Sequence, residues 1–334
     1  MKKYLYIFIA TMLLIISFDF AQGSPTPKKH LGIATYSVKG LETDIEGTFK
    51  VLSENGYVTM EISNYDANSG KVAGRAPADY AALATKYGLT IISSHARTKF
   101  DVKDVPATVA AWGKVFDDHK LMGCKYVVFP MNIWSGNLDI LKEECNLMNK
   151  IGEEANKRGI KFGYHNHSFE FVPVAGTEQL YEDYLIQNTD PEKVFFQMDV
   201  YWVTMGGQDP VAYLKKYPNR FKVLHIKDEY VIGESGKINY KAIFEQFYKN
   251  GNEDWFVEIE EKMAPGAEST IYSYDGCYEE ITGTGRHNAG FDEGNVEKQT
   301  TGNSSSGFRS PGSKSNGRKT ENIARSHSAK CRIS

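Results

Sequence analysis

Polar and ionisable side chains stand in pairs at the ends of four apolar segments. The members of each pair are two residues apart, which places both on the same face of a β-strand. The pairs are His165 and His167 in "KFGYHNHSFEF", Asp199 and Tyr201 in "VFFQMDVYW", His225 and Lys227 in "RFKVLHIKDEY", and Glu258 and Glu260 in "DWFVEIEEKM". A buried charge without a partner is costly, so these groups must satisfy one another or a bound cation. They therefore point to metal binding and proton transfer.

A mixture of carboxylates and imidazoles makes a site rich in oxygen and nitrogen. Such a site suits a divalent cation, with Mn²⁺ as the first choice and Co²⁺, Zn²⁺ or Mg²⁺ as alternatives. It differs from the cysteine-based sets of structural zinc. Single residues have simpler explanations, since Asp199 alone could cap the following helix and His225 could pair with Asp228. Polar groups at four successive strand ends together favour a real site.

The segments that must position these residues alternate in type. From His30 to Met263, eight short apolar runs alternate with seven amphipathic runs. This rhythm predicts an α/β protein with a closed, parallel (β/α)8 TIM barrel. An open, doubly wound sheet is the alternative, but a Gly-rich phosphate-binding turn does not follow the first strand. In a barrel the carboxyl ends of all strands meet at one mouth, so the four pairs are expected to converge.

The motifs at these strand ends resemble the sugar phosphate isomerase/epimerase family of the xylose isomerase-like TIM barrel superfamily, which also contains endonuclease IV. The resemblance is carried by "GYHNHSFEF", "QMDVYWVTMGGQDP", "VLHIKDE" and "WFVEIE", and it covers residues 30–280. It implies a divalent cation held by Asp199, His225 and Glu258, with a fourth ligand after the fifth strand. We assign that fourth ligand to Glu170, with a histidine as the alternative.

The two ends of the chain differ from this middle part. Lys2 and Lys3 precede an apolar run over residues 4–18, and small residues follow, which is the pattern of a secretory signal peptide over residues 1–23. The run is short for a membrane span, so we expect no stable membrane anchor after processing. The expected location is the periplasm or the exterior of the cell.

Residues 281–334 are rich in Gly, Ser, Asn, Lys and Arg and poor in apolar residues. This composition predicts a disordered or aberrant tail. The eighth helix is therefore expected to be degenerate or missing, and the barrel to stay partly open between its first and eighth strands.

The site predicts chemistry at a carbon beside a sugar carbonyl. A cation that holds neighbouring carbonyl and hydroxyl oxygens polarises the carbonyl, and a base then removes the α-proton. Return of the proton gives isomerisation or epimerisation, whereas a leaving group β to the carbonyl gives a lyase acting on a 3-keto-glycoside. We expect His167 and Glu258 to transfer protons and Lys227 to stabilise the oxyanion. The expected substrate contacts are His95, His165, Trp134 and Trp202.

Composition and expected location narrow the class of molecule that the protein can bind. The chain has 334 residues and a formal net charge of −3, which lacks the basic character of a nucleic-acid-binding protein. An endonuclease needs a basic surface and a non-catalytic sugar-binding protein needs no inward set of ligands, so both are less favoured. Sugar phosphates are scarce outside the cytoplasm, so the expected partner is a small unphosphorylated or oxidised sugar. The sequence leaves the oligomeric state open.

Overall fold

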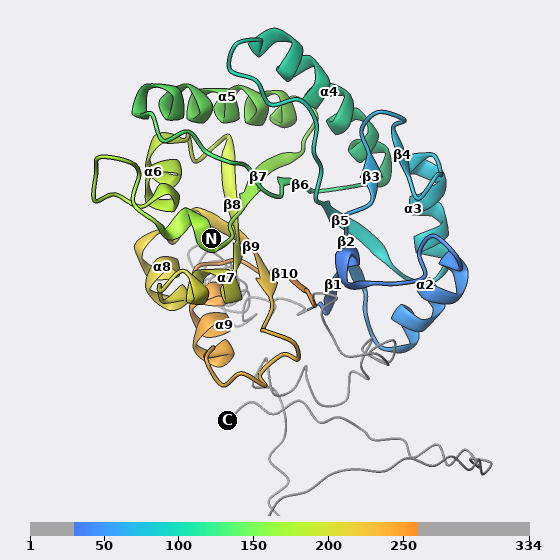
Figure 1. Ribbon diagram of the computed structural model, residues 1–334. Coiled ribbons are helices and arrows are strands. Elements are labelled where there is room, and N and C mark those ends of the chain that lie inside the picture. Colours follow the sequence, from blue (N-terminus) through green and yellow to red (C-terminus); the bar gives the residue numbers. More distant parts are fainter. Residues whose placement is uncertain (1–29, 260–334) are drawn as a thin grey trace, which may run out of the picture.

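The computed structural model describes residues 30–259. In this part of the chain, eight parallel strands surround a central axis and helices cover their outer side (Figure 1). The predicted TIM barrel is confirmed. The barrel strands are β1 (Gly32–Ala34), β2 (Thr59–Ile62), β5 (Thr90–Ser94), β6 (Tyr126–Phe129), β7 (Lys161–His165), β8 (Val194–Asp199), β9 (Phe221–Ile226) and β10 (Asp254–Val257).

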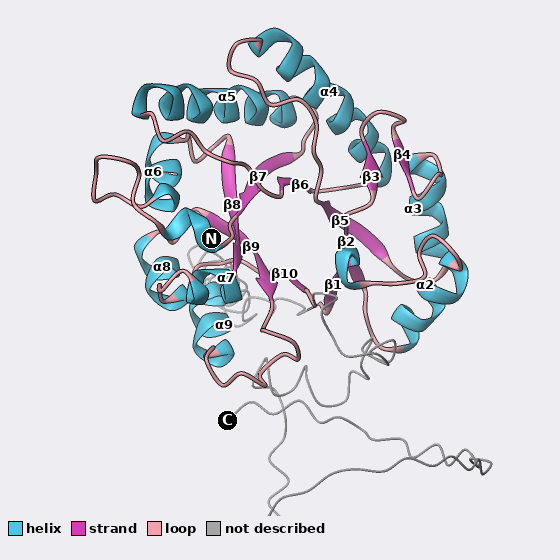
Figure 2. Ribbon diagram, in the orientation of Figure 1, coloured by secondary structure: helices cyan, strands magenta, loops and turns pink. Residues whose placement is uncertain are grey.

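The helices lie between the strands in the chain and outside them in space (Figure 2). Several begin at an Asp or Asn whose side chain accepts a hydrogen bond from the first turn, as Asp104 does for α4 and Asn239 for α9. The helices are α2 (Ile45–Glu54), α3 (Pro77–Lys86), α4 (Val105–Met122), α5 (Leu138–Asn156), α6 (Tyr181–Asn188), α7 (Val200–Met205), α8 (Pro210–Lys216) and α9 (Tyr240–Lys249), with short 3-10 turns η1 (Thr35–Ser37) and η2 (Ser168–Phe171).

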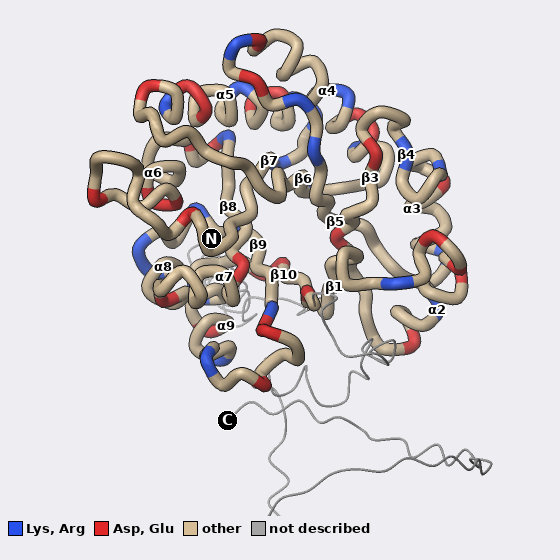
Figure 3. The backbone as a smooth tube through the Cα atoms, in the orientation of Figure 1, with Lys and Arg blue, Asp and Glu red and all other residues tan. Residues whose placement is uncertain are grey.

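Charged residues of both signs are interspersed around the outer helices and loops (Figure 3). Among residues 30–259, none of the helices is both long and apolar enough to cross a membrane. The predicted signal peptide, the region of the eighth helix that we expect to be degenerate or missing, and the predicted tail lie outside the described residues.

The barrel closes where we expected a gap. β1 and β10 are hydrogen-bonded parallel neighbours, with Ile33 opposite Val257, so the prediction of an opening between the first and eighth strands is wrong. Pairing of the two strands satisfies their backbone donors and acceptors whether or not a helix covers them. The looser seam lies between β5 and β6, which are joined by an isolated bridge from His95 to Val128.

The inside of the barrel is filled in layers. Side chains from six strands form an apolar cluster of their own, separate from the core between sheet and helices: Ala34, Ile92, Tyr126, Val128, Phe195, Val223 and Phe256. Gly163 leaves room for this cluster, because a Cβ there would lie 2.5 Å from the ring of Phe195. Two residues beyond Phe195, Val223 and Phe256 stand the polar residues Gln197, His225 and Glu258. The polar groups at the carboxyl ends of the strands therefore lie next to this apolar layer.

Two local features were missed from sequence. A small antiparallel hairpin, β3 (Tyr65–Asp66) with β4 (Lys71–Val72), follows β2. The strand expected to run to Trp202 ends at Asp199, because the Asp199 Oδ1 accepts the Trp202 N–H at 3.0 Å and starts α7. Tyr201 is therefore on a helix, and it does not share a strand face with Asp199.

Candidate active site

Four side chains converge at the mouth of the barrel, one from each of four neighbouring strands or strand ends. Each offers one ligand atom, and these atoms all lie within 4.8 Å of one another. All four residues are buried. We call them the ligand group: His165 at the end of β7, Asp199 at the end of β8, His225 in β9 and Glu258 directly after β10. Sequence analysis named three of them as ligands and the fourth as a substrate contact.

The ligand group has the donor atoms that a divalent cation requires. Asp199 Oδ2 is buried and has no hydrogen-bond partner within residues 30–259, and it lies 3.9 Å from His165 Nε2. His225 Nδ1 lies 2.5 Å from Glu258 Oε2. Buried carboxylate oxygens are normally satisfied by hydrogen bonds, so an open one beside two imidazoles suggests an oxygen- and nitrogen-binding metal. The residues present fit such an ion.

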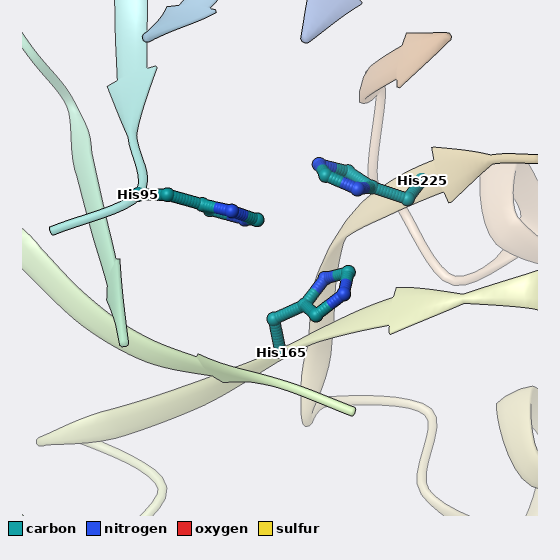
Figure 4. Close-up of side chains that lie close together, drawn as sticks. All are labelled: His95, His165 and His225. Carbon is teal, nitrogen blue, oxygen red and sulfur yellow. The ribbon is translucent and has the colours of Figure 1, made fainter. Parts of the chain in front are cut away.

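A third histidine stands beside the ligand group (Figure 4). The ring of His95 stacks on that of His225 at 5.0 Å between centroids, and both approach the ring of His165. These three histidines form a second set with ligand atoms close enough to share an ion. His95, which we predicted as a substrate contact, therefore lies at the edge of the ligand group.

Sequence analysis missed two residues that hold these rings in place. Glu61 on β2 is fully buried, and its Oε1 lies 2.5 Å from His225 Nε2 and 3.1 Å from His95 Nε2. Gln197 on β8 lies with its Oε1 2.7 Å from His95 Nε2 and 3.0 Å from His165 Nδ1, and it donates to Glu61 at 2.7 Å. Such partners fix the orientation of ligating imidazoles.

A signal for both residues was present in the sequence. Gln197 stands two residues before Asp199 and so shares its strand face. Glu61 is an acid inside the apolar run "YVTMEIS", and an acid in such a run needs a buried partner.

The ligand group and the neighbouring Glu61 have strongly shifted pKa values. Burial opposes the charge on Glu61, but His95 and His225 outweigh it and lower the pKa of Glu61 to about 2. Burial likewise opposes the charge on His225, yet Glu61 and Glu258 raise its pKa to about 10. Burial raises the pKa of Asp199 to about 7, against the opposing charge of Lys227. His225 therefore carries a proton between two carboxylates. Binding of a dication at this place would release that proton.

Lys227 and His167 border the ligand group. Lys227 is buried, with its Nζ 3.1 Å from Glu258 Oε1 and 4.7 Å from the ring centroid of Trp202. The ring of His167 lies 5.8 Å from that of Trp202, and its buried Nδ1 has no hydrogen-bond partner within the described residues. Burial and the charge of Lys227 lower the pKa of His167 to about 4. His167 is therefore a neutral imidazole that can accept a proton.

A cavity of about 420 Å³ opens over these groups. His95, His165, His167 and Glu258 all line it, together with hydroxyl, guanidinium and apolar side chains from the loops. Its size is at the lower end of the range for small-molecule sites. Of the four predicted substrate contacts, His95 and His165 line this cavity, and Trp134 and Trp202 do not.

The structure places Glu170 outside the ligand group. The Tyr164 hydroxyl donates to Glu170 Oε1, and the His167 N–H donates to Glu170 Oε2 at 2.8 Å. The 3-10 turn η2 folds Glu170 back over its own strand, an arrangement that sequence reasoning did not anticipate. Burial raises the pKa of Glu170 to about 7. His165, the alternative ligand, stands within the group instead.

The two predicted tryptophan contacts lie on different sides. Trp202 is beside Lys227 and His167, next to the ligand group. Trp134 is buried and donates its indole N–H to the Tyr164 hydroxyl at 3.0 Å. It lines a second, apolar cavity and not the one over the ligand group.

Comparison with known proteins agrees with this architecture. Residues 49–274 match the family model of the xylose isomerase-like TIM barrel. A crystal structure of a sugar phosphate isomerase/epimerase from Parabacteroides distasonis ATCC 8503 is 33% identical, with a TM-score of 0.70, and the match covers 77% of this chain and 97% of that chain.

Among curated proteins, the chain is similar to inosose dehydratases. That of Geobacillus thermodenitrificans is 25% identical over 264 residues, which is 68% of this chain and 85% of the relative. That of Clostridium tetani is 29% identical over 147 residues, which is 37% of this chain and 48% of the relative. The chain therefore spans about half the length of the latter relative.

Proposed function

We propose that this protein catalyses a metal-dependent reaction that removes the proton beside the carbonyl of an unphosphorylated or oxidised sugar. The chain belongs to the xylose isomerase-like TIM barrel family. The observation that carries this proposal is the open Asp199 Oδ2 among the converging side chains of the ligand group. Isomerases, epimerases and dehydratases of keto sugars share this first step. The named relatives of the chain are of these kinds.

His165, Asp199, His225 and Glu258 would hold the cation. Mn²⁺ is our first choice because the set mixes two carboxylates with two imidazoles, and Co²⁺, Zn²⁺ and Mg²⁺ are the alternatives. When bound, a divalent cation supplies polarisation of the substrate carbonyl.

The chain's own residues then divide the proton transfer. His167 is neutral and has an open Nδ1 beside the cavity, so it is our candidate for the base that takes the α-proton. Lys227 places an ammonium within the buried site, where it can donate a hydrogen bond to the oxygen that becomes negative. Glu258 is the second proton-transfer candidate, because it lines the same cavity as His167.

Two outcomes are possible once the α-proton has been removed. Return of the proton at the neighbouring carbon or on the opposite face gives an isomerase or epimerase, which is our first candidate and is favoured by the Parabacteroides relative. Loss of a group β to the carbonyl gives a lyase, for example on a 3-keto-glycoside. The inosose dehydratase relatives favour this second candidate, because a dehydratase also expels a group from a sugar-like ring.

Exchange of hydrogen with solvent tests the shared step. Unphosphorylated aldoses, ketoses and 3-keto-glycosides are incubated with the Mn²⁺-loaded protein in deuterated water, and deuterium at the α-carbon is followed by NMR. We expect exchange with one of these classes, and His167→Gln should slow it by about 10²-fold or more. The metal content of His167→Gln is the control and should equal that of the wild type.

The products of the same reaction separate the two candidates. A new isomer or epimer indicates the first, and release of an alcohol or water with a new double bond indicates the second. Absence of exchange with every class would contradict the proposal, and hydrolysis of phosphodiesters in its place would favour the endonuclease class.

We also propose that the protein acts in the periplasm or outside the cell, on the strength of the pattern in residues 1–23. Expression of the full chain in a bacterial host, followed by fractionation and N-terminal sequencing, tests this. A cytoplasmic protein that retains Met1 would contradict it.

A further inference from the structure

A second cavity of about 440 Å³ lies at the barrel mouth, between the loop after β6 and the η2 turn after β7. It is lined by Met131, Ile133, Trp134, Phe169 and Tyr181. Among the described residues, this lining has no charged side chain. Ile133 is 87% exposed and Phe169 is 40% exposed, which is unusual for side chains of this size. We call it the apolar cavity.

The apolar cavity adjoins the cavity over the ligand group. Met131 lines both of them. The ring of Phe169 stacks on the ring of His167, with centroids 5.4 Å apart and planes at 10°, and His167 lines the first cavity. The side chains of Met131, His167 and Phe169 therefore connect the lining of one cavity with that of the other.

The floor of the apolar cavity is held rigidly. The Trp134 indole and the Asn132 N–H both donate to the Tyr164 hydroxyl, at 3.0 and 3.1 Å, and that hydroxyl donates to Glu170. Glu170 in turn accepts the His167 N–H. One buried carboxylate thus ties the wall of the apolar cavity to the loop that carries His167. A cavity preorganised in this way loses little order when a ligand enters it.

We propose that the apolar cavity is a subsite for an aromatic or apolar substituent carried by the sugar whose reacting carbons lie over the ligand group. This rests on the proposed function. The lining offers aromatic and aliphatic surface but few polar atoms, and the hydroxyl of Tyr181 already donates to the Ser135 carbonyl at 3.4 Å. A second hydroxyl-rich ring would therefore lose hydrogen bonds to water there, whereas a flat apolar group would gain contact. The substrate class is accordingly a keto-glycoside with an apolar substituent, which fits the epimerase and lyase forms of the proposed function and not aldose–ketose isomerisation.

Binding of two inert glucosides tests the subsite without any turnover. We compare p-nitrophenyl β-D-glucopyranoside with methyl β-D-glucopyranoside by calorimetry on the full chain in the presence of Mn²⁺. Neither compound has the carbonyl on which the proposed reaction depends. We expect the aryl glucoside to bind at least about tenfold more tightly, because its ring can enter the apolar cavity.

Ile133→Ser is the diagnostic variant, since its side chain is exposed and its loss should not disturb folding. It should reduce the preference for the aryl glucoside toward unity while binding of the methyl glucoside and metal content stay unchanged. Leu121→Ser, an exposed leucine on α4 outside both cavities, is the matched control and should keep the preference.

Three results would overturn the subsite. These are equal affinity for the two glucosides, an aryl preference that survives Ile133→Ser, and absence of binding by either compound. Sedimentation of the wild type and Ile133→Ser is run in parallel, because a change of mass without an aryl preference would assign the surface to a second copy of the chain. Loss of the subsite alone leaves the α-hydrogen exchange of the proposed function intact, whereas failure of the proposed function abolishes that exchange and leaves the aryl preference.

Discussion

The ligand group and the Glu170 network lie next to each other at the barrel mouth, and both are built around buried carboxylates. They differ in how those carboxylates are satisfied. Asp199 uses one oxygen to cap α7 and leaves the other open toward His165. Glu170 uses both oxygens, one for the Tyr164 hydroxyl and one for the His167 N–H. An open buried oxygen indicates a place for a ligand, and a saturated one indicates a structural tie.

The difference begins in β7, where adjacent residues point to opposite faces of the strand. His165 faces the barrel axis and joins the ligand group. Tyr164 faces the outer core, where Trp134 and Glu170 meet its hydroxyl. One strand therefore supplies both regions, and variants can separate them.

The largest expected effect comes from replacing the carboxylate of Asp199, whose Oδ2 has no hydrogen-bond partner among the described residues. Asp199→Asn keeps a good helix cap for α7 but removes the charge, so metal content should fall from about one cation per chain to background. Mass spectrometry of the dialysed protein measures this. Asp209→Asn is the matched control, because Asp209 also caps a helix, α8, but is exposed and outside the ligand group. Equal metal content in both variants would remove the distinction between the two carboxylates.

The second effect concerns pH and the Glu170 network. The folded-state pKa of Glu170 is raised to about 7, so the wild type loses stability as pH rises from about 4.5 to 7, by on the order of 3 kcal/mol. Gln does not titrate, so the stability of Glu170→Gln relative to wild type should increase over this window. Denaturation at several pH values measures the difference. A pH-independent difference, or loss of metal from this variant, would contradict a purely structural Glu170.

The third effect sharpens the picture of the ligand group itself. Glu61 contacts His225 and His95 without belonging to the group, so Glu61→Gln should weaken metal affinity by about 10- to 100-fold and not abolish it. Competition with a chelator measures the affinity. Glu234→Gln, on the surface, should leave it unchanged. Unaltered affinity in Glu61→Gln would show that the imidazoles are oriented without this carboxylate.

The smallest effect is expected in the Glu170 network. Trp134→Phe removes the indole donor to Tyr164 while keeping an aromatic ring, so unfolding should become easier by about 1 kcal/mol. Thermal or chemical denaturation measures this change. Metal content should remain that of the wild type, and a loss of metal would mean that the two regions are coupled.

Local sequence patterns predicted a large part of this molecule. The alternation of apolar and amphipathic runs predicted the barrel, because each strand and each helix has its own period. The same two-residue period placed His165, His225 and Glu258 toward the mouth, since the carboxyl ends of parallel strands meet there. These inferences needed nothing beyond neighbouring residues.

Tertiary structure decided how the remaining polar groups pair. Glu61 meets His225 and Gln197 across the barrel axis, between strands that lie far apart in the chain, and no local period links such positions. Pairing of β1 with β10 joins the first and last strands of the described chain, which no local pattern links. Glu170 lies outside the ligand group because it follows the end of β7, in a 3-10 turn. In such a turn the direction of a side chain depends on the hydrogen bonds available nearby, which here come from the Tyr164 hydroxyl and the His167 N–H.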